Sequence, residues 1–228
     1  MRIGRQMFFG AVAMAALTGG ANATVLIQST FDTDAEGWRA FSNSPGFTLH
    51  PVTWTPANGG MLAHQAPSDN ATSFFLAPAA FVSALHGAIN GSISYDIGSE
   101  RAERTDTYFS SAVDVQVGAG TNRIRAGFIT SAPGFPVLNH FSLTFDTSHP
   151  WMFFDGTTTT VATQNQIDTV LTGATSLIIR GEYWSSSKPD TAYLDNVVLG
   201  AIPEPETFAL MLAGLGALTI AARRRKAS

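Results

Sequence analysis

The sequence predicts an all-β protein built as an antiparallel β-sandwich of the jelly-roll kind. Short segments in which apolar and polar residues alternate recur along the chain, and this alternation is the period of a half-buried strand. Glycine, proline, asparagine and aspartate separate these segments and provide turns. Many short strands joined by turns are typical of a sandwich or barrel.

Five segments carry the strand prediction, in this order along the chain. Residues 47–50 alternate, and residues 92–97 do the same before a glycine. Residues 113–117 show the clearest alternation. Residues 176–180 are instead a short run of β-forming apolar side chains, which is typical of a central strand. Residues 193–199 are predicted as the last strand of the domain.

Helical signals are confined to two short stretches. Residues 79–86 follow Pro78, a residue tolerated at the start of a helix. Residues 164–171 form the second stretch, which is expected to end near Gly173. The strands therefore dominate the predicted fold.

The N-terminal 23 residues predict a secretory signal peptide. Two arginines precede an uncharged, mostly apolar run at residues 7–17, which is too short to cross a bilayer core of roughly 30 Å. Ala21 and Ala23 then give the small-x-small pattern that signal peptidase cleaves. The mature chain is expected to begin at Thr24, with one domain covering residues 24–202.

The C-terminal end, residues 203–228, has three parts in a fixed order. A Pro-Glu-Pro triplet opens it, and residues 207–222 follow without a charge, long enough for a short hydrophobic helix that enters the membrane. A basic cluster would hold the end of that helix on the cytoplasmic side. The residues involved in processing are Pro203, Glu204, Pro205, Arg223, Arg224 and Arg225.

This order resembles the PEP-CTERM sorting signal of exported proteins in Gram-negative bacteria that make exopolysaccharide. The resemblance implies recognition by an exosortase, a membrane transpeptidase, and cleavage near the Pro-Glu-Pro triplet. It implies sorting to the cell envelope, the cell surface or an extracellular matrix. The alternative is a plain single-span anchor, which also tethers the protein to the membrane.

The composition of the predicted domain excludes several classes of function. Residues 24–202 hold seven Lys and Arg against fifteen Asp and Glu, a net charge of −8 with His neutral. Such an acidic domain lacks the basic footprint that nucleic acid requires. The chain has no cysteine, which excludes thiol catalysis, thiolate zinc sites and disulfides.

The domain also resembles the laminin B module, or laminin type IV module, in the order of its short motifs. They are 31–38, which ends in Gly-Trp, 74–81, 91–96, 170–183 and 192–197. A more distant similarity is to jelly-roll carbohydrate-binding modules that open with a Phe-acid and Gly-Trp strand. Both resemblances imply a β-sandwich with an adhesive or binding role and no catalysis.

One candidate site is a structural calcium site. Asp32, Asp34 and Glu36 alternate, so on one straight strand their carboxylates would face the same way and repel. Calcium prefers such oxygen ligands. In jelly-roll binding modules a calcium ion often joins the first strand to the last, and the matching positions are Asp32 and Asp195. The alternative is a solvated acidic turn, which the sequence of residues 34–37 also favours.

The second candidate site consists of aromatic residues that stack on sugar rings. Trp184 precedes a polar loop that contains Lys188 and Asp190, and Trp54 lies among prolines and a glycine. A tryptophan at a loop mouth suits a sugar ring, with the loop side chains bonding its hydroxyls. The alternative for both is a place in the core. Trp38 and Trp151 are expected in the core.

No catalytic motif is present. The five histidines lack the H-E-x-x-H spacing of zinc proteases, and no G-x-S-x-G elbow occurs. The sequence therefore predicts a non-enzymatic exported protein that binds polysaccharide or another envelope component. Two alternatives stay open: a polysaccharide hydrolase that uses a carboxylate pair among Glu100, Glu103 and Glu182, and a module that self-associates.

Overall fold

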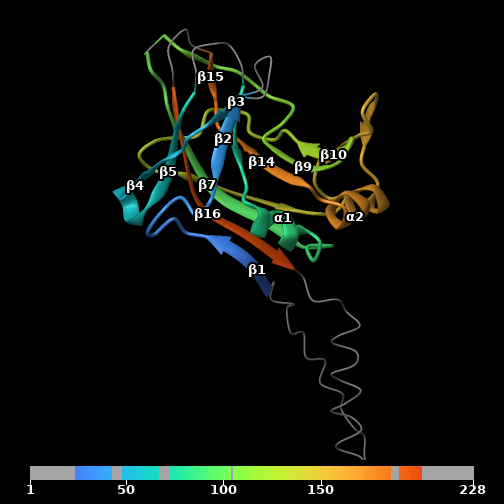
Figure 1. The fold of residues 1–228 in the computed structure, drawn as a ribbon. Coiled ribbons are helices and arrows are strands. Elements are labelled where there is room, and N and C mark those ends of the chain that lie inside the picture. Colours follow the sequence, from blue (N-terminus) through green and yellow to red (C-terminus); the bar gives the residue numbers. More distant parts are fainter. Residues whose placement is uncertain (1–23, 43–47, 67–71, 104, 186–189, 202–228) are drawn as a thin grey trace, which may run out of the picture.

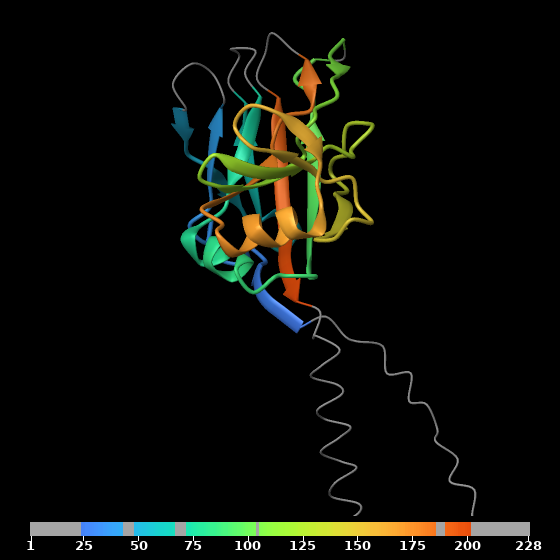
Figure 2. The same cartoon turned by 90° about the vertical axis from the view of Figure 1, so that its right-hand side faces the viewer.

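Two antiparallel β-sheets facing each other make up the part of the chain described by the structure, a computed structural model (Figures 1 and 2). The described residues are 24–42, 48–66, 72–103, 105–185 and 190–201. This arrangement confirms the predicted all-β sandwich. The predicted signal peptide 1–23 and sorting segment 203–228 lie outside the described residues.

The first sheet has six strands in the order β11-β7-β16-β5-β4, and β1 pairs with β16. The long strand β16 lies at its centre and contacts β7, β5 and β1. The strands are β1 (Thr24–Ser29), β4 (Thr53–Thr55), β5 (Met61–Gln65), β7 (Ser92–Glu100), β11 (Asn139–Thr144) and β16 (Thr191–Ala201).

The second sheet has eight strands in the order β13-β12-β10-β9-β14-β6-β2-β3. The strands are β2 (Arg39–Ser42), β3 (Thr48–His50), β6 (Ser73–Leu76), β9 (Val115–Ala119), β10 (Asn122–Ala126), β12 (Met152–Phe154), β13 (Thr159–Val161) and β14 (Ser176–Arg180). A two-stranded ribbon of β8 (Thr107–Tyr108) and β15 (Trp184–Ser185) completes the β structure.

Two short helices cover one end of the sandwich (Figure 2). Helix α1 (Ala79–Leu85) starts after Pro78 and buries Phe81 and Leu85. Helix α2 (Gln164–Thr172) starts with a capping box in which the Thr163 hydroxyl and the Gln166 side chain each satisfy a backbone N–H. A 3₁₀ turn, η1 (Ala57–Gly59), precedes β5. Both α-helices lie where the sequence predicts them.

The core lies between the two sheets. Alternate residues of β7 are buried, with Ile93, Tyr95 and Ile97 completely inaccessible, as the period of two in the sequence requires. Trp38 and Trp151 are buried, which confirms their expected core positions.

All five predicted strands are present where the structure describes them. Strand β14 has the predicted bounds and lies inside its sheet between β9 and β6. Strand β9 begins two residues later than predicted. The reason is that the Asp114 carboxylate turns inward and accepts hydrogen bonds from the backbone N–H groups of Phe128 and Ile129. Within the described segments no helix is long and apolar enough to cross a membrane.

Candidate ligand-binding site

Trp184 lies on β15, at the end of the sandwich opposite the start of β1 and the end of β16 (Figure 1). Its side chain is half-buried, and the indole N–H donates to the Ser99 hydroxyl at 3.1 Å. That hydroxyl donates in turn to the Pro133 carbonyl at 3.0 Å. These bonds fix the orientation of the indole ring.

An open cavity of about 480 Å³ lies beside this ring. Charged, aromatic and backbone groups line this cavity. The guanidinium of Arg101 is 5.6 Å from the centre of the Trp184 ring, which is within cation–π distance. The lining residues are Ser99, Glu100, Arg101, Ala132, Pro133, Gly134, Phe135 and Trp184. A concave site with an aromatic wall and a few polar groups has the general character of a ligand site.

The opposite wall of the cavity is held by stacked aromatic rings. Phe135 is stacked on Tyr193 with ring centres 4.0 Å apart, and the Tyr193 hydroxyl donates to Glu100 at 3.0 Å. Burial, together with the bond to Glu100, raises the pKa of Tyr193 to about 12. Tyr193 therefore stays a neutral donor at physiological pH.

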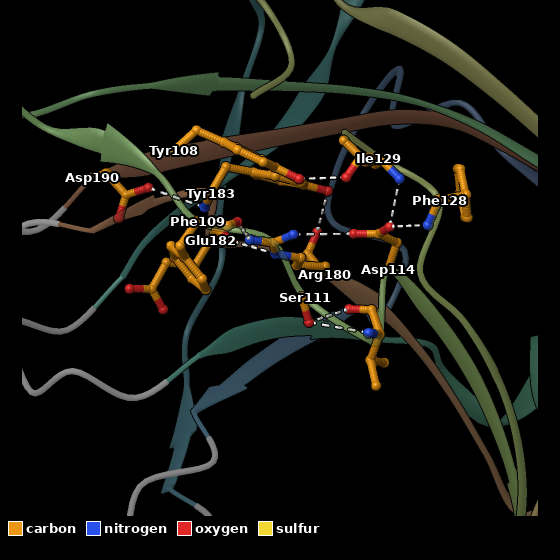
Figure 3. Close-up of polar contacts among 11 residues, drawn as sticks. Tyr108, Phe109, Ser111, Asp114, Phe128, Ile129, Arg180, Glu182, Tyr183 and Asp190 are labelled. Atoms are coloured by element: carbon orange, nitrogen blue, oxygen red, sulfur yellow. Dashed lines mark hydrogen bonds and ion pairs between the residues drawn. The ribbon is translucent and has the colours of Figure 1, made fainter. Parts of the chain in front are cut away.

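A buried network around Arg180 supports the segment that carries Trp184 (Figure 3). The Arg180 guanidinium is completely buried and donates to the Asp114 carboxylate at 3.2 Å and to the Glu182 carbonyl at 2.6 Å, as well as to the Phe109 carbonyl. It also lies 4.5 Å from the ring centre of Tyr183. Each of its three nitrogens has an oxygen partner, as a buried charge requires.

Asp114, the residue directly before β9, completes the network. Its second carboxylate oxygen accepts from the backbone N–H groups of Phe128 and Ile129 at 2.6 and 2.7 Å (Figure 3). Tyr108 donates its hydroxyl to the Ile129 carbonyl and pairs with Trp184 across the β8–β15 ribbon. The network therefore connects the core to the ribbon on which the candidate site rests.

The two loop residues predicted beside Trp184 have different outcomes. Asp190 is 2% exposed, and its carboxylate accepts from the Tyr183 N–H (Figure 3), so it supports the ribbon from inside. Burial raises the pKa of Asp190 to about 6. Lys188 lies outside the described residues.

Trp54, the other predicted sugar-stacking residue, packs against the core from β4. Its indole N–H donates to the Phe31 carbonyl at 2.6 Å. This bond holds the start of the acidic turn against the first sheet, and the geometry supports a role for Trp54 in packing.

The acidic residues predicted as calcium ligands do not lie on a straight strand. Residues 32–37 form a turn with positive φ at Glu36 and Gly37, which is the alternative to a straight strand that the sequence also favours. Asp34 accepts from the Glu36 N–H at 2.6 Å, and Glu36 accepts from the Phe31 N–H at 2.7 Å. Asp32 accepts from the Thr30 hydroxyl at 2.8 Å. The turn thus uses its carboxylates to bond its own backbone and side chains.

Asp195 nevertheless lies within electrostatic reach of this turn. It is 8% exposed, beside a bulge of β16 at which Asn196 has a φ of 48°. Burial, with repulsion from Asp96, Asp32 and Glu36, raises the pKa of Asp195 to about 6 against a hydrogen bond from Asn196. Among the residues that the structure describes, however, no three His, Asp or Glu side chains converge to hold a metal ion.

The outer face of the eight-stranded sheet carries a second concave surface. A groove of about 380 Å³ contains the apolar side chains of Phe41, Leu49, Leu76 and Ile178. Phe41 stacks on Phe74 with ring centres 5.4 Å apart. Beyond the groove, two arginines lie over an aromatic ring: Arg123 and Arg125 are 5.7 and 5.4 Å from the centre of Phe154.

The carboxylates considered for hydrolysis do not face one another across the candidate cavity. Glu182 is 8% exposed and accepts from the Ser73 N–H at 2.9 Å. Of the described residues that line the cavity, Glu100 alone is acidic. A glycosidase pair needs two carboxyl groups within about 5–10 Å of each other on either side of the bond that is cleaved.

The sequence analysis predicts Trp184 as a ligand-binding residue but not the neighbours that the structure places beside it. Neither Arg101 nor Phe135 stands in a sequence pattern that points to a ligand site. The ring of Phe135 stacks on Tyr193, which lies almost 60 residues later in the chain. Such a contact is set by the fold and has no local pattern.

Comparisons with known proteins give information on the sorting of the chain and on its fold. Residues 201–226 match the PEP-CTERM protein-sorting motif, so the chain carries the sorting signal of an exported, envelope-sorted protein. A comparison with functionally characterised protein sequences gives no match.

Among solved structures, the L4b domain of human laminin alpha-2 is similar with a TM-score of 0.52 and 14% identity. The likeness covers 78% of this chain and 99% of that domain. The family 11 carbohydrate-binding module of a Clostridium thermocellum cellulase has a TM-score of 0.45 and 11% identity, over 81% of this chain and 98% of that module. The laminin likeness confirms the β-sandwich, and at this identity it shows the fold alone.

Proposed function

We propose that the protein is a non-enzymatic polysaccharide-binding protein of the bacterial envelope, with its binding site at the Trp184 cavity. The observation that carries the proposal is a half-exposed tryptophan, fixed by the Ser99 hydroxyl, at the wall of an open cavity. An indole face packs well against the C–H face of a sugar ring. The charged groups of Glu100 and Arg101 suit sugar hydroxyls or a sugar carboxylate.

The sorting motif supports an envelope location for this activity. Its presence at residues 201–226 indicates that the protein is exported and sorted. We expect processing by signal peptidase after Ala23 and by an exosortase near Pro203, with the segment 207–222 holding the chain at the membrane until then. Deleting residues 203–228 should release the protein into the medium of a host that makes an exosortase. Unchanged localisation would contradict the sorting role.

A glycan array tests the binding role directly. The wild-type chain should bind a subset of polysaccharides, and Trp184→Ala or Arg101→Gln should weaken that binding by more than about tenfold. The matched controls are Phe154→Ala and Arg123→Gln, which remove the same kind of cation–π pair from another face of the molecule. Loss of binding in the controls alone would move the site to the outer sheet face, and silence on every array would reject the proposal.

A second candidate function, self-association, has its own observation. Leu49 is 54% exposed beside the groove of the outer sheet face, and Val161 is 75% exposed on β13, a strand at the edge of that sheet. Apolar edges of this kind favour pairing between molecules. Sedimentation of the wild type and of Val161→Lys would test it: a dimer that the lysine dissociates supports this function, and a monomer at all concentrations rejects it.

Structural calcium at Asp32 and Asp195 is part of the proposal. It is supported by the repulsion that raises the pKa of Asp195, since a cation would remove this repulsion. The side chains would have to turn away from their present hydrogen bonds to converge on an ion. Chelation should therefore lower the melting temperature if calcium is bound, and Asp195→Asn should abolish this response. An unchanged melting temperature would remove calcium from the proposal.

A further inference from the structure

Four polar side chains, called the histidine pocket, lie between the two sheets: Ser42, His50 and Ser73 on β2, β3 and β6 of one sheet, and His64 on β5 of the other. Ser42 and Ser73 pair in register on β2 and β6, and both side chains are completely buried. The Ser42 hydroxyl lies 3.1 Å from Nε2 of His50 on β3. The His50 ring faces the ring of His64, which comes from the opposite sheet.

Three buried polar atoms of this pocket have no hydrogen bond. They are both ring nitrogens of His64, whose side chain is 2% exposed, and the hydroxyl of Ser73. An unpaired buried polar atom destabilises the folded state, and nearly all such atoms in native proteins have a partner. These atoms therefore indicate a ligand, either water or an ion.

The spacing of the two imidazoles selects between these ligands. Imidazole nitrogens bind transition metals at about 2.0–2.1 Å, which places two ring centres on one ion roughly 5–6 Å apart. The ring centres of His50 and His64 are 5.7 Å apart. We propose that His50 and His64 together bind one divalent late transition-metal ion, with Cu²⁺ the tightest of the series.

Each histidine keeps one nitrogen for the ion and has an oxygen near the other. When Nε2 of His50 donates to the Ser42 hydroxyl, Nδ1 carries the free lone pair. The Pro51 carbonyl lies near the His64 ring. Such outer oxygens orient ligating histidines in metal sites.

The His64 side chain is 2% exposed, so an ion bound to it would be shielded from bulk water. The Ser73 hydroxyl adds a buried polar group that can bond to a water on the ion.

One of the two proposed ligands, His50, also borders solvent. His50 lines an open surface cavity of about 370 Å³ together with Arg39, Pro51 and Val52. The site is distinct from the acidic turn, where the donors are carboxylate oxygens that suit calcium. Two imidazoles are borderline ligands that select copper, nickel or zinc over calcium.

The test uses the full-length chain without an affinity tag, purified in detergent with excess Ca²⁺ to saturate any oxygen-ligated site. Titration with CuSO₄ is followed by calorimetry and by electron paramagnetic resonance. We expect one equivalent of Cu²⁺ whose spectrum shows hyperfine coupling to two imidazole nitrogens. Bound Cu²⁺ should also raise the melting temperature, because it binds only the folded state.

Variants assign the signal to the pocket. His50→Gln should weaken Cu²⁺ binding at least about tenfold and remove one nitrogen from the spectrum. His140→Gln is the matched control, because this exposed histidine pairs with Asp96 on the other side of the first sheet, and it should leave binding unchanged. His64→Gln, checked for folding by circular dichroism, should abolish the site. Cu²⁺ binding that survives His50→Gln, or a spectrum without nitrogen coupling, would overturn the proposal and leave internal water as the occupant.

Discussion

Two buried polar regions of the sandwich differ in how completely their groups are paired. In the Arg180 network the guanidinium and the Asp114 carboxylate have all their partners within the protein, although both side chains are completely buried (Figure 3). In the histidine pocket three buried atoms of His64 and Ser73 have none. A self-contained network supports the fold, whereas a region with unpaired donors and acceptors is prepared for something else to bind.

The two regions also differ in how each one relates to a candidate binding site. The Arg180 network supports the ribbon that carries Trp184, so it acts on the candidate sugar site through structure. The side chains of the histidine pocket are instead proposed to bind an ion themselves. The following variants test whether the two regions differ in this way.

The largest effect is expected from breaking the paired region. Asp114→Ala leaves the buried Arg180 charge without its counterion and should lower the free energy of unfolding by about 3–5 kcal/mol. Urea denaturation measures this change. His140→Ala, which breaks an ion pair that is 65% exposed on the histidine side, should cost less than about 1 kcal/mol. Equal losses in the two variants would show that the Arg180–Asp114 pair stabilises the fold no more than an exposed pair does.

A smaller effect is expected from replacing Asp190, at the edge of the same network. This replacement should raise the free energy of unfolding at neutral pH, whereas Asp114→Ala lowers it. Its pKa is about 6 in the folded protein and 3.8 in the unfolded chain, so the folded state holds the proton more tightly. The wild type should therefore lose stability as pH rises from about 4 through 6, by up to about 3 kcal/mol.

Asp190→Asn should be free of that loss, because the amide oxygen still accepts from the Tyr183 N–H. The variant should match the wild type near pH 4 and exceed it near pH 8 in urea denaturation at each pH. A stability difference that does not change with pH would show that Asp190 is ionised like an exposed aspartate.

The smallest effects concern the two serines of the histidine pocket in metal-free protein. Ser73→Ala removes an unpaired buried hydroxyl and should raise the free energy of unfolding by about 1 kcal/mol. Ser42→Ala removes the bond to His50 and should lower it by about 1 kcal/mol. Thermal unfolding of both variants decides the signs. A loss in Ser73→Ala would mean that an internal water already pairs this hydroxyl.

The sequence predicted the elements of the fold well, because each depends on local pattern. The alternation of residues 92–97 and the apolar run of β14 both fix which side chains face the core. Helix α2 was predicted from a short stretch that ends near Gly173. The bounds of β9 were less accurate, since Asp114 is withdrawn from the strand by a contact with Ile129, 15 residues later.

The sites were predicted less completely, because they depend on contacts between distant segments. Trp184 was predicted from its loop, whereas Arg101 and Phe135, from other parts of the chain, come to lie beside it only in the folded structure. His50 and His64 are close in sequence but belong to opposite sheets, so no spacing motif announces them. The acidic turn was expected as one of two alternatives, and backbone bonding to Asp34 and Glu36 decided for the turn.

The pairing of β1 with β16 determines how the sandwich responds to mechanical load. Thr24 pairs with Ala201, so the first and last described residues meet at one end, while β15, the strand that carries Trp184, lies at the other (Figure 1). Tension between a glycan in the cavity and a tether that follows Ala201 would run along β16. The ladders of β16 with β1, β5 and β7 lie parallel to that direction and would be sheared together, instead of opening one hydrogen bond at a time. The central strand thus makes the domain suited to holding under force.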